Sequence, residues 1–138
     1  NIIAVLVEPI QGEGGINMGA IEYVRGLRDI CNQQNWLFML DEVQCGIGRT
    51  GPWFVYQHAN VLPDVLTLAK GLGGGMTVAA VVGKADIMDA AAPGGFGSTY
   101  AGHPVAVASA LAVLDVIADE KLQLLDFKTT PMSVERNW

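Results

Sequence analysis

The chain of 138 residues is poor in cysteine and histidine. Its two cysteines, Cys31 and Cys45, form no CxxC pair, so we expect two unpaired thiols in a reducing, cytoplasmic compartment. The two histidines, His58 and His103, are too few and too far apart in the sequence for a convincing metal site. We therefore expect neither a disulfide framework nor a bound metal ion.

Charged residues and long apolar runs are also scarce. Only 16% of the residues are charged and 51% are hydrophobic, which argues against disorder and favours one well-covered core. The net charge of −6 argues against nucleic acid or an anionic membrane surface as a partner. The longest apolar stretch, residues 65–83, contains Lys70 and several glycines, so we expect no membrane span.

The chain also lacks an initiator methionine and a basic leader, and it begins within an apolar run. We therefore expect an internal piece of a longer protein. The amphipathic pattern fades after residue 122, which divides the chain into part of one large domain, residues 1–122, and a divergent, irregular tail, residues 123–138.

Strand-like and helix-like segments alternate along the chain. Strands are expected at residues 2–7, 36–40, 65–69 and 78–83, the first two of them buried, with long helices at 19–34 and 104–119 and short helices at 53–58 and 86–91. Residues 11–15 are expected to form a glycine-rich loop. This alternation predicts a three-layer α/β/α fold with a mostly parallel sheet that helices cover on both faces.

The helix expected at 19–34 has an apolar and a polar face. The inward face is expected to contain Ile21, Val24, Leu27 and Ile30. The solvated face is expected to contain Glu22, Arg25 and Asp29.

Lys70 is the most informative residue, because it ends an apolar run and opens a glycine-rich one. An amine at this junction is costly to hold unless it has a task. Asp41 ends the preceding expected strand, and the hydroxyl residues Ser98 and Thr99 follow in a loop. Ligands of open α/β sheets sit beyond the carboxyl ends of the strands, where Glu8, Asp41 and Lys70 should meet. A carboxylate, a lysine and hydroxyls are the groups that a pyridoxal phosphate (PLP) site requires.

The chemistry of PLP suggests a role for each of these residues. Asp41 would keep the pyridine nitrogen protonated, Lys70 would form the Schiff base and transfer protons, and the hydroxyls would meet the phosphate. Each residue also has an ordinary explanation as a cap, turn or surface residue. We assign catalysis to Lys70 and Asp41, and cofactor binding to Lys70, Asp41, Val43, Gln44, Ser98 and Thr99.

Residues 46–51 match the GxGxxG pattern of dinucleotide-binding folds. These glycines do not directly follow a strand, no long helix follows them, and Asp64 precedes a strand instead of ending one. We therefore reject the dinucleotide interpretation and keep a nucleotide-binding α/β module only as a minor alternative.

Six stretches, in this order and spacing, resemble the class III (ω-) aminotransferases of PLP fold type I. They are residues 7–15, 41–44, 48–51, 63–64, 69–71 and 99–102. The resemblance implies that Lys70 is the Schiff-base lysine, that Asp41 pairs with the pyridine nitrogen, and that Val43 and Gln44 contact the cofactor. It also implies that Thr99 binds the phosphate in the neighbouring subunit of a homodimer. Glu13 resembles the glutamate that masks a substrate-binding arginine, so that one site can alternate between two substrates.

The amino donor is less clearly indicated. Residues 53–58 resemble acetylornithine aminotransferases, whereas residues 86–90 and 92–104 resemble 4-aminobutyrate aminotransferases. We give the second set more weight because its loop is expected at the site, although Thr77 and His103 replace the usual proline and asparagine. The expected reaction is PLP-dependent transamination of a 4-aminobutyrate-like ω-amino acid with 2-oxoglutarate, with an acetylornithine or ornithine donor as the alternative.

A non-catalytic interpretation also stays open. The family's phosphate-binding glycines, ring-stacking aromatic residue, carboxylate-binding arginines and small domain are not found in this sequence. A truncated fragment without catalytic activity is therefore the alternative of another class. We expect negligible transaminase activity from the isolated chain.

Overall fold

The computed structural model describes residues 2–124, so the expected tail lies outside the described residues from residue 125 onward. A four-stranded sheet forms the centre, in the order β1 (Ala4–Val7), β4 (Leu37–Asp41), β5 (Val65–Leu68), β6 (Ala80–Gly83). The first three strands are parallel, and β6 is antiparallel to β5. The mostly parallel sheet expected from the sequence is confirmed.

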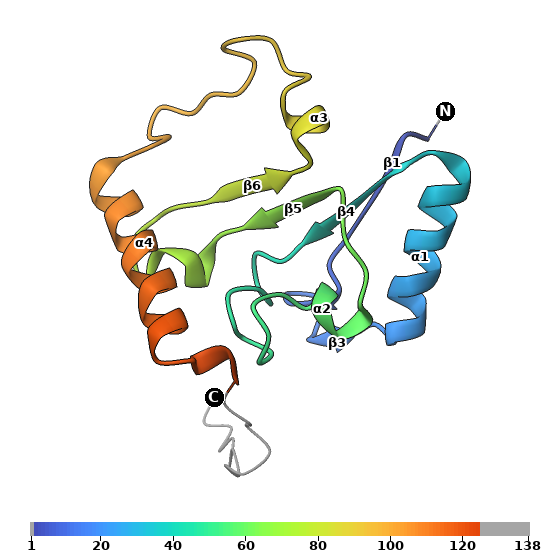
Figure 1. Cartoon of the computed structure of the whole chain (residues 1–138), viewed down its shortest axis with the longest axis horizontal. Coiled ribbons are helices and arrows are strands. Elements are labelled where there is room, and N and C mark those ends of the chain that lie inside the picture. Colours follow the sequence, from blue (N-terminus) through green and yellow to red (C-terminus); the bar gives the residue numbers. More distant parts are fainter. Residues whose placement is uncertain (1, 125–138) are drawn as a thin grey trace.

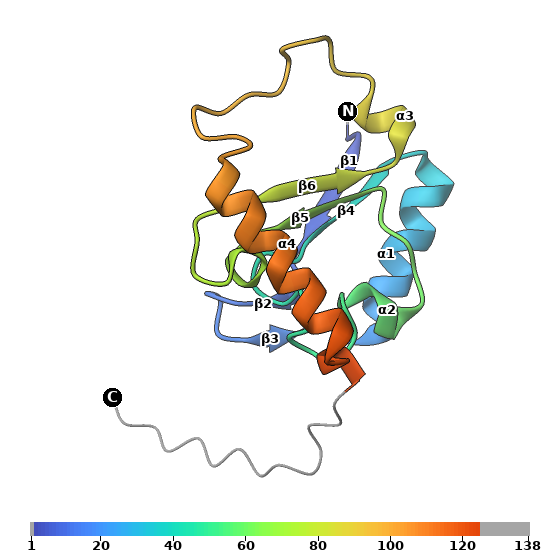
Figure 2. The same ribbon diagram turned by 60° about the vertical axis from the view of Figure 1, so that its left-hand side comes forward.

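Helices flank this sheet. They are α1 (Ile21–Gln34), α2 (Tyr56–Ala59), α3 (Ala85–Met88) and α4 (Pro104–Asp119), with 3-10 turns η1 (Lys70–Gly73) and η2 (Leu122–Leu124). Figures 1 and 2 show α1 and α4 on opposite sides of the sheet. Helix α4 has the bounds expected from the sequence and carries Pro104 in its first turn, where a missing N–H leaves no helical bond unmade. No helix among the described residues has the length and apolar character that crossing a membrane requires.

A small hairpin, β2 (Ile10–Gln11) and β3 (Asn17–Met18), replaces part of the loop expected at residues 11–15. Its turn is held from outside, because the Glu8 carboxylate accepts a hydrogen bond from the Gly12 amide at 2.9 Å. Strands of two residues have no periodicity to read, which explains why the sequence pattern did not indicate them.

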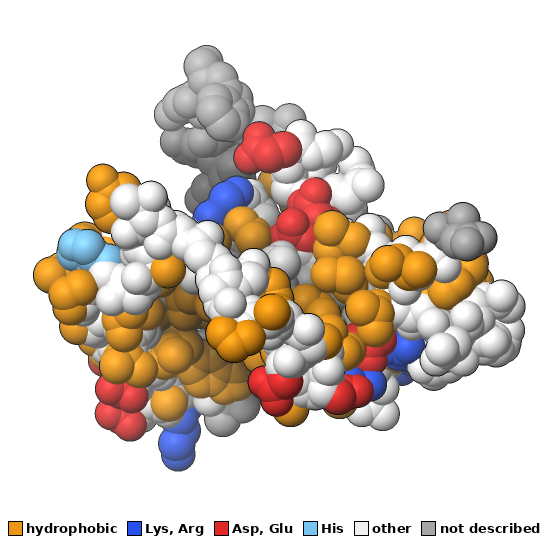
Figure 3. Space-filling view, turned by 90° about the horizontal axis from the view of Figure 1, so that it is seen from above, with side chains coloured by type: hydrophobic (Ala, Val, Ile, Leu, Met, Phe, Trp, Pro, Cys, Tyr) orange, Lys and Arg blue, Asp and Glu red, His pale blue; other side chains and the backbone are white. Residues whose placement is uncertain are grey.

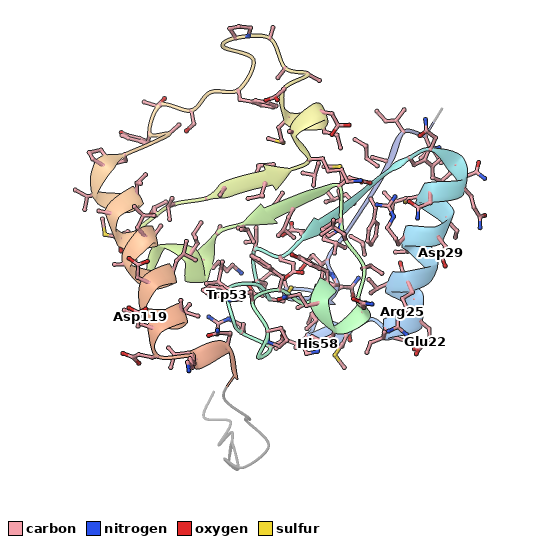
Figure 4. All side chains as sticks on the ribbon, in the orientation of Figure 1. Glu22, Arg25, Asp29, Trp53, His58 and Asp119 are labelled. Atoms are coloured by element: carbon pink, nitrogen blue, oxygen red, sulfur yellow. The ribbon has the colours of Figure 1, made fainter. Side chains whose placement is uncertain are left out.

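The inward face of α1 differs from the expected one. Val24 and Cys31 are buried, whereas Ile21 and Ile30 are 41% and 45% exposed, so their inward assignment is wrong. Arg25 is exposed, as expected, and its Nε also donates to the Ala59 carbonyl of α2 at 2.8 Å; Figure 4 shows it on the α2 side of α1. Polar partners on α2 and on the loop before β5 therefore rotate the helix away from its most apolar face.

The core fills the space between α1 and the sheet. Phe38 and Leu40 of β4 are fully buried there with Leu66 and Leu68 of β5. Burial of each such side chain stabilises the fold by roughly 1.5–3 kcal/mol. One face of the sheet is thus closely packed against α1.

The two outer strands of the sheet are partly exposed, which for β1 differs from the expectation. Leu6 of β1 is 60% exposed and Val81 of β6 is 56% exposed, so β1 is not buried on both faces as its apolar run suggested. β1 and β6 lie at the two edges of the sheet, which explains the difference. Figure 3 shows hydrophobic side chains spread over the surface seen from above, with acidic and basic side chains between them.

Asp64, which directly precedes β5, joins α1 to β4 and to the residue that follows β6. Its carboxylate accepts hydrogen bonds from the Arg28 guanidinium at 2.7 Å and the Phe38 amide at 2.8 Å, and it pairs with Lys84. Burial alone would raise the pKa of this carboxyl, but the hydrogen bonds from Lys84, Phe38 and Arg28 outweigh it and lower the pKa to about 2. Asp64 therefore has a structural role, which agrees with our rejection of the dinucleotide interpretation.

Candidate active site

Lys70 lies directly beyond the carboxyl end of β5 and opens η1. Its φ angle is +38°, in the left-handed region that residues with a Cβ adopt at a cost of about 1–2 kcal/mol. Backbone strain of this kind concentrates at functional sites, where the surrounding structure holds it in place. The conformation of Lys70 therefore supports a functional role for this turn.

A cavity of about 690 Å³ opens beside Lys70. Residues 75–79, Ser98, residues 100–103 and Ala106 form its other walls. Ligand sites in proteins commonly measure 300–1,000 Å³, so the space suits a cofactor or a substrate of small-molecule size. The two departures from the family pattern, Thr77 and His103, both line this cavity.

The structure brings Ser98 to this cavity but places Thr99 differently. Thr99 is exposed and does not belong to the described lining of the cavity. An exposed hydroxyl next to the site is free to meet a group from outside this chain. The predicted role of Thr99 in a neighbouring subunit is compatible with this position and stays a prediction.

Asp41 ends β4 on the same side of the sheet as Lys70, where the carboxyl ends of the parallel strands lie. It is the register partner of Thr67 in β5, and Thr67 lies three residues before Lys70. Adjacent strands are about 4.8 Å apart, so the Asp41 carboxylate lies one strand away from the segment that leads to Lys70. The Val43 amide donates to Asp41 Oδ1 at 3.0 Å and thereby orients the carboxylate.

The loop at residues 12–15 connects Lys70 to Gln44. Glu13 Oε1 lies 4.0 Å from Lys70 Nζ, but the Glu13 side chain is 96% exposed, so this ion pair contributes little to stability. Gly12 packs on Gln44 so closely that a Cβ at residue 12 would lie 2.7 Å from Gln44 Cγ. Three residues predicted for the site, Glu13, Gln44 and Lys70, therefore lie around one loop.

Two buried polar atoms near Asp41 have no hydrogen-bond partner within residues 2–124. They are Gln44 Oε1 and Thr67 Oγ1. Buried polar atoms are normally paired, and an unpaired one calls for a ligand, an ion or water. PLP carries a phenolic oxygen, a ring nitrogen and a phosphate, so the donors and acceptors present here fit this cofactor. Thr67 was missed at the sequence level, and its only signal was its place before Lys70.

Glu42, next to Asp41, has a different task. Its buried carboxylate accepts hydrogen bonds from the backbone amides of Val55 and Tyr56 at 2.8 and 3.0 Å and so holds the start of α2. Burial raises the pKa of Glu42, and the two amide donors partly offset this rise. Burial, followed by the nearby Glu42 carboxylate, raises the pKa of the Cys45 thiol to about 12, which makes it unreactive at neutral pH.

The arrangement of a lysine, a carboxylate and glycine-rich turns matches a known family. The model of the aminotransferase class-III family matches residues 1–127. The chain belongs to the class III aminotransferases. The match confirms the family that the sequence motifs indicated.

Curated relatives of this class III aminotransferase chain have several names. An acetylornithine aminotransferase of Nitrosomonas europaea is 50% identical over 121 residues, which cover 88% of this chain and 31% of the relative. A 5-aminovalerate aminotransferase, DavT, of Pseudomonas aeruginosa is 50% identical over 122 residues, which cover 88% of this chain and 29% of the relative. The chain thus spans about 30% of the length of these relatives.

Solved structures agree with this family. The ornithine aminotransferase of Toxoplasma gondii, described with partial occupancy of PLP at its active site, superposes with a TM-score of 0.83 at 44% identity, over 88% of this chain and 29% of its own. The acetylornithine aminotransferase of Elizabethkingia anophelis gives a TM-score of 0.83 at 48% identity, over 88% and 30%. Both superpositions cover 88% of this chain.

Proposed function

We propose that this class III aminotransferase chain supplies the lysine-bearing part of a PLP site that transfers an amino group from an ω-amino acid to 2-oxoglutarate. The observation that carries the proposal is the strained Lys70, which lines a cavity of about 690 Å³ and follows β5, the strand that pairs with Asp41 at the end of β4. The partial occupancy of PLP described for the Toxoplasma gondii relative supports the choice of cofactor.

Each predicted site residue has a defined task in this proposal. When bound, PLP supplies an aldehyde that condenses with amines and a cationic ring that accepts electrons. Lys70 Nζ would hold the aldehyde carbon and would move the proton of the donor carbon that bears the transferred amine. Asp41 holds a proton on the ring nitrogen, since a carboxylate beside this nitrogen stabilises its protonated form.

The remaining residues bind and orient the cofactor. Gln44 meets the phenolic oxygen and Val43 packs on the ring face. Ser98 and Thr99 bind phosphate oxygens, and the exposure of Thr99 suits the phosphate in a neighbouring subunit of a homodimer. We also propose a cytoplasmic location, as predicted from the two unpaired thiols. Both cysteines are free and buried.

We propose a donor whose amine lies at the end of the carbon chain, 4-aminobutyrate-like or, as the alternative, acetylornithine or ornithine. The names of the relatives support this class, because acetylornithine and 5-aminovalerate both carry such an amine. The position of Glu13 near Lys70 supports a site that alternates between this donor and 2-oxoglutarate. The choice between the donors depends on the cavity lining, which Thr77 and His103 alter.

Titration of the chain with PLP tests the proposal. The unsubstituted chain should develop the visible absorbance of a lysine–PLP adduct, and Lys70→Ala should abolish it. Lys121→Ala is the control, because Lys121 is also exposed, whereas Lys84 is paired with the buried Asp64 carboxylate. Equal absorbance from Lys70→Ala and the unsubstituted chain would refute the assignment. Turnover of amino donors by the isolated chain should be negligible.

A further inference from the structure

The turn that carries Lys70 is fastened to helix α4. Ser109 Oγ donates a hydrogen bond to the carbonyl of Gly73, the last residue of η1, at 2.8 Å and in a partly buried position. These two residues are 36 positions apart in the sequence. The same carbonyl accepts a second hydrogen bond from the Met76 amide at 2.9 Å. One oxygen of the turn therefore binds both helix α4 and the segment that follows η1.

Close packing accompanies this hydrogen bond. A Cβ at Gly74 would lie 2.7 Å from Val113 Cγ2, and Gly74 itself has a φ of +56°. Val113 lies one helical turn after Ser109, so both side chains face η1. Ala106 and Ala110 are the buried residues of α4, and their small side chains let the helix approach the turn. The helix and the turn therefore cannot shift independently.

Helix α4 also forms part of the wall of the cavity beside Lys70, through Ala106 and its N-cap His103. Ser109 does not belong to the described lining of that cavity. It reaches Lys70 only through the backbone of η1, where the Leu72 amide donates to the Ala69 carbonyl at 2.9 Å. Ser109 is thus placed to control how the turn is held, without touching a ligand.

We propose that Ser109 is a positioning residue for Lys70, whose left-handed backbone it holds by anchoring the far end of the η1 turn to α4. The proposal rests on the proposed function for the importance of the Lys70 amine. A left-handed lysine persists only where its surroundings compensate the strain. Among the described residues of α4, Ser109 provides the side-chain hydrogen bond to this turn.

Three variants of the 138-residue chain test this role. Ser109→Ala removes the hydroxyl, Ser109→Thr restores it, and Ala112→Ser is a control of similar size at an exposed position of α4. The first measurement is amide hydrogen exchange at Leu72, which reports the turn without any cofactor. The second is the ratio of Lys70 to Lys121 adducts after treatment with PLP and borohydride, measured by peptide mass mapping.

Ser109→Ala should accelerate exchange at Leu72 roughly fivefold, the change expected for one lost hydrogen bond. It should also lower the Lys70 to Lys121 ratio by a similar factor, whereas Ser109→Thr and Ala112→Ser should resemble the unsubstituted chain. A merely structural role would leave the ratio unchanged, and that result would overturn the proposal. Unchanged exchange at Leu72 in Ser109→Ala would overturn it as well. A lack of preference for Lys70 in the unsubstituted chain would instead count against the proposed function.

Discussion

At the scale of single residues, the Asp64 side chain binds three partners from different segments of the fold. The carboxylate binds Arg28, the Phe38 amide and Lys84. Because its folded pKa of about 2 lies below the ordinary value of 3.8, the ionised form stabilises the fold above about pH 4. This stabilisation is lost as the pH falls from 4 towards 2.

Asp64→Asn should therefore lower the free energy of unfolding at pH 7 by about 2 kcal/mol, the amount that such a pKa difference represents. Urea unfolding followed by circular dichroism at pH 7 and at pH 3 measures the effect. The loss between the two pH values should be smaller in Asp64→Asn than in the unsubstituted chain. Asp29→Asn, at an exposed position of α1, is the control, and equal midpoints for the two variants would contradict the prediction.

Thr67 offers a test in which stability and binding separate. Its buried hydroxyl has no partner within the described part of the chain, so the isosteric change Thr67→Val removes no internal hydrogen bond. We expect the free energy of unfolding to stay within about 0.5 kcal/mol or to rise. The dissociation constant for PLP should increase about fivefold, since one hydrogen bond to the bound group would be lost. Thr67→Ser should retain affinity; a destabilised Thr67→Val with unchanged affinity would contradict this account.

At the scale of elements, the bounds of the long helices were more predictable than their faces. The sequence period placed α1 and α4 correctly to within two residues. It could not show that Arg25 and Arg28 would find partners on α2 and Asp64, and these contacts turned Ile21 and Ile30 outward. The contacts join segments about 34–36 residues apart in the sequence, which a local pattern does not report.

Two glycines, Gly26 and Gly46, differ in whether the structure leaves room for a side chain. Gly26 lies within α1, and a Cβ there would meet no described atom within 4 Å, whereas a Cβ at Gly46 would lie 2.8 Å from the Glu42 carbonyl oxygen. Gly26→Ala should raise the free energy of unfolding by roughly 0.5–1 kcal/mol through helix propensity. Gly46→Ala should lower it by about 1–3 kcal/mol, because backbone and the buried Glu42 would have to shift. Thermal unfolding compares them, and a shift of the same sign in both would contradict the packing described here.

At the scale of the whole molecule, the position of the site at the carboxyl ends of the parallel strands was predictable. The detailed geometry of the site was not. Apolar runs that end in Asp41 and Lys70 located two parallel strands and the edge where they meet. The left-handed turn at Lys70, the anchor from Ser109 and the unpaired hydroxyl of Thr67 depend on how distant segments pack. The roles of the site residues and the choice of amino donor remain predictions for experiment.

The most direct test of the central claim is the distribution of covalently fixed PLP over the lysines of the unsubstituted chain. After borohydride reduction and proteolysis, mass spectrometry measures the adduct at Lys70 relative to Lys121, which is also exposed. The proposed site predicts that the adduct forms mainly at Lys70, at PLP concentrations that leave Lys121 almost unmodified. Equal modification of the two lysines would show that Lys70 is an ordinary surface amine and would contradict the account.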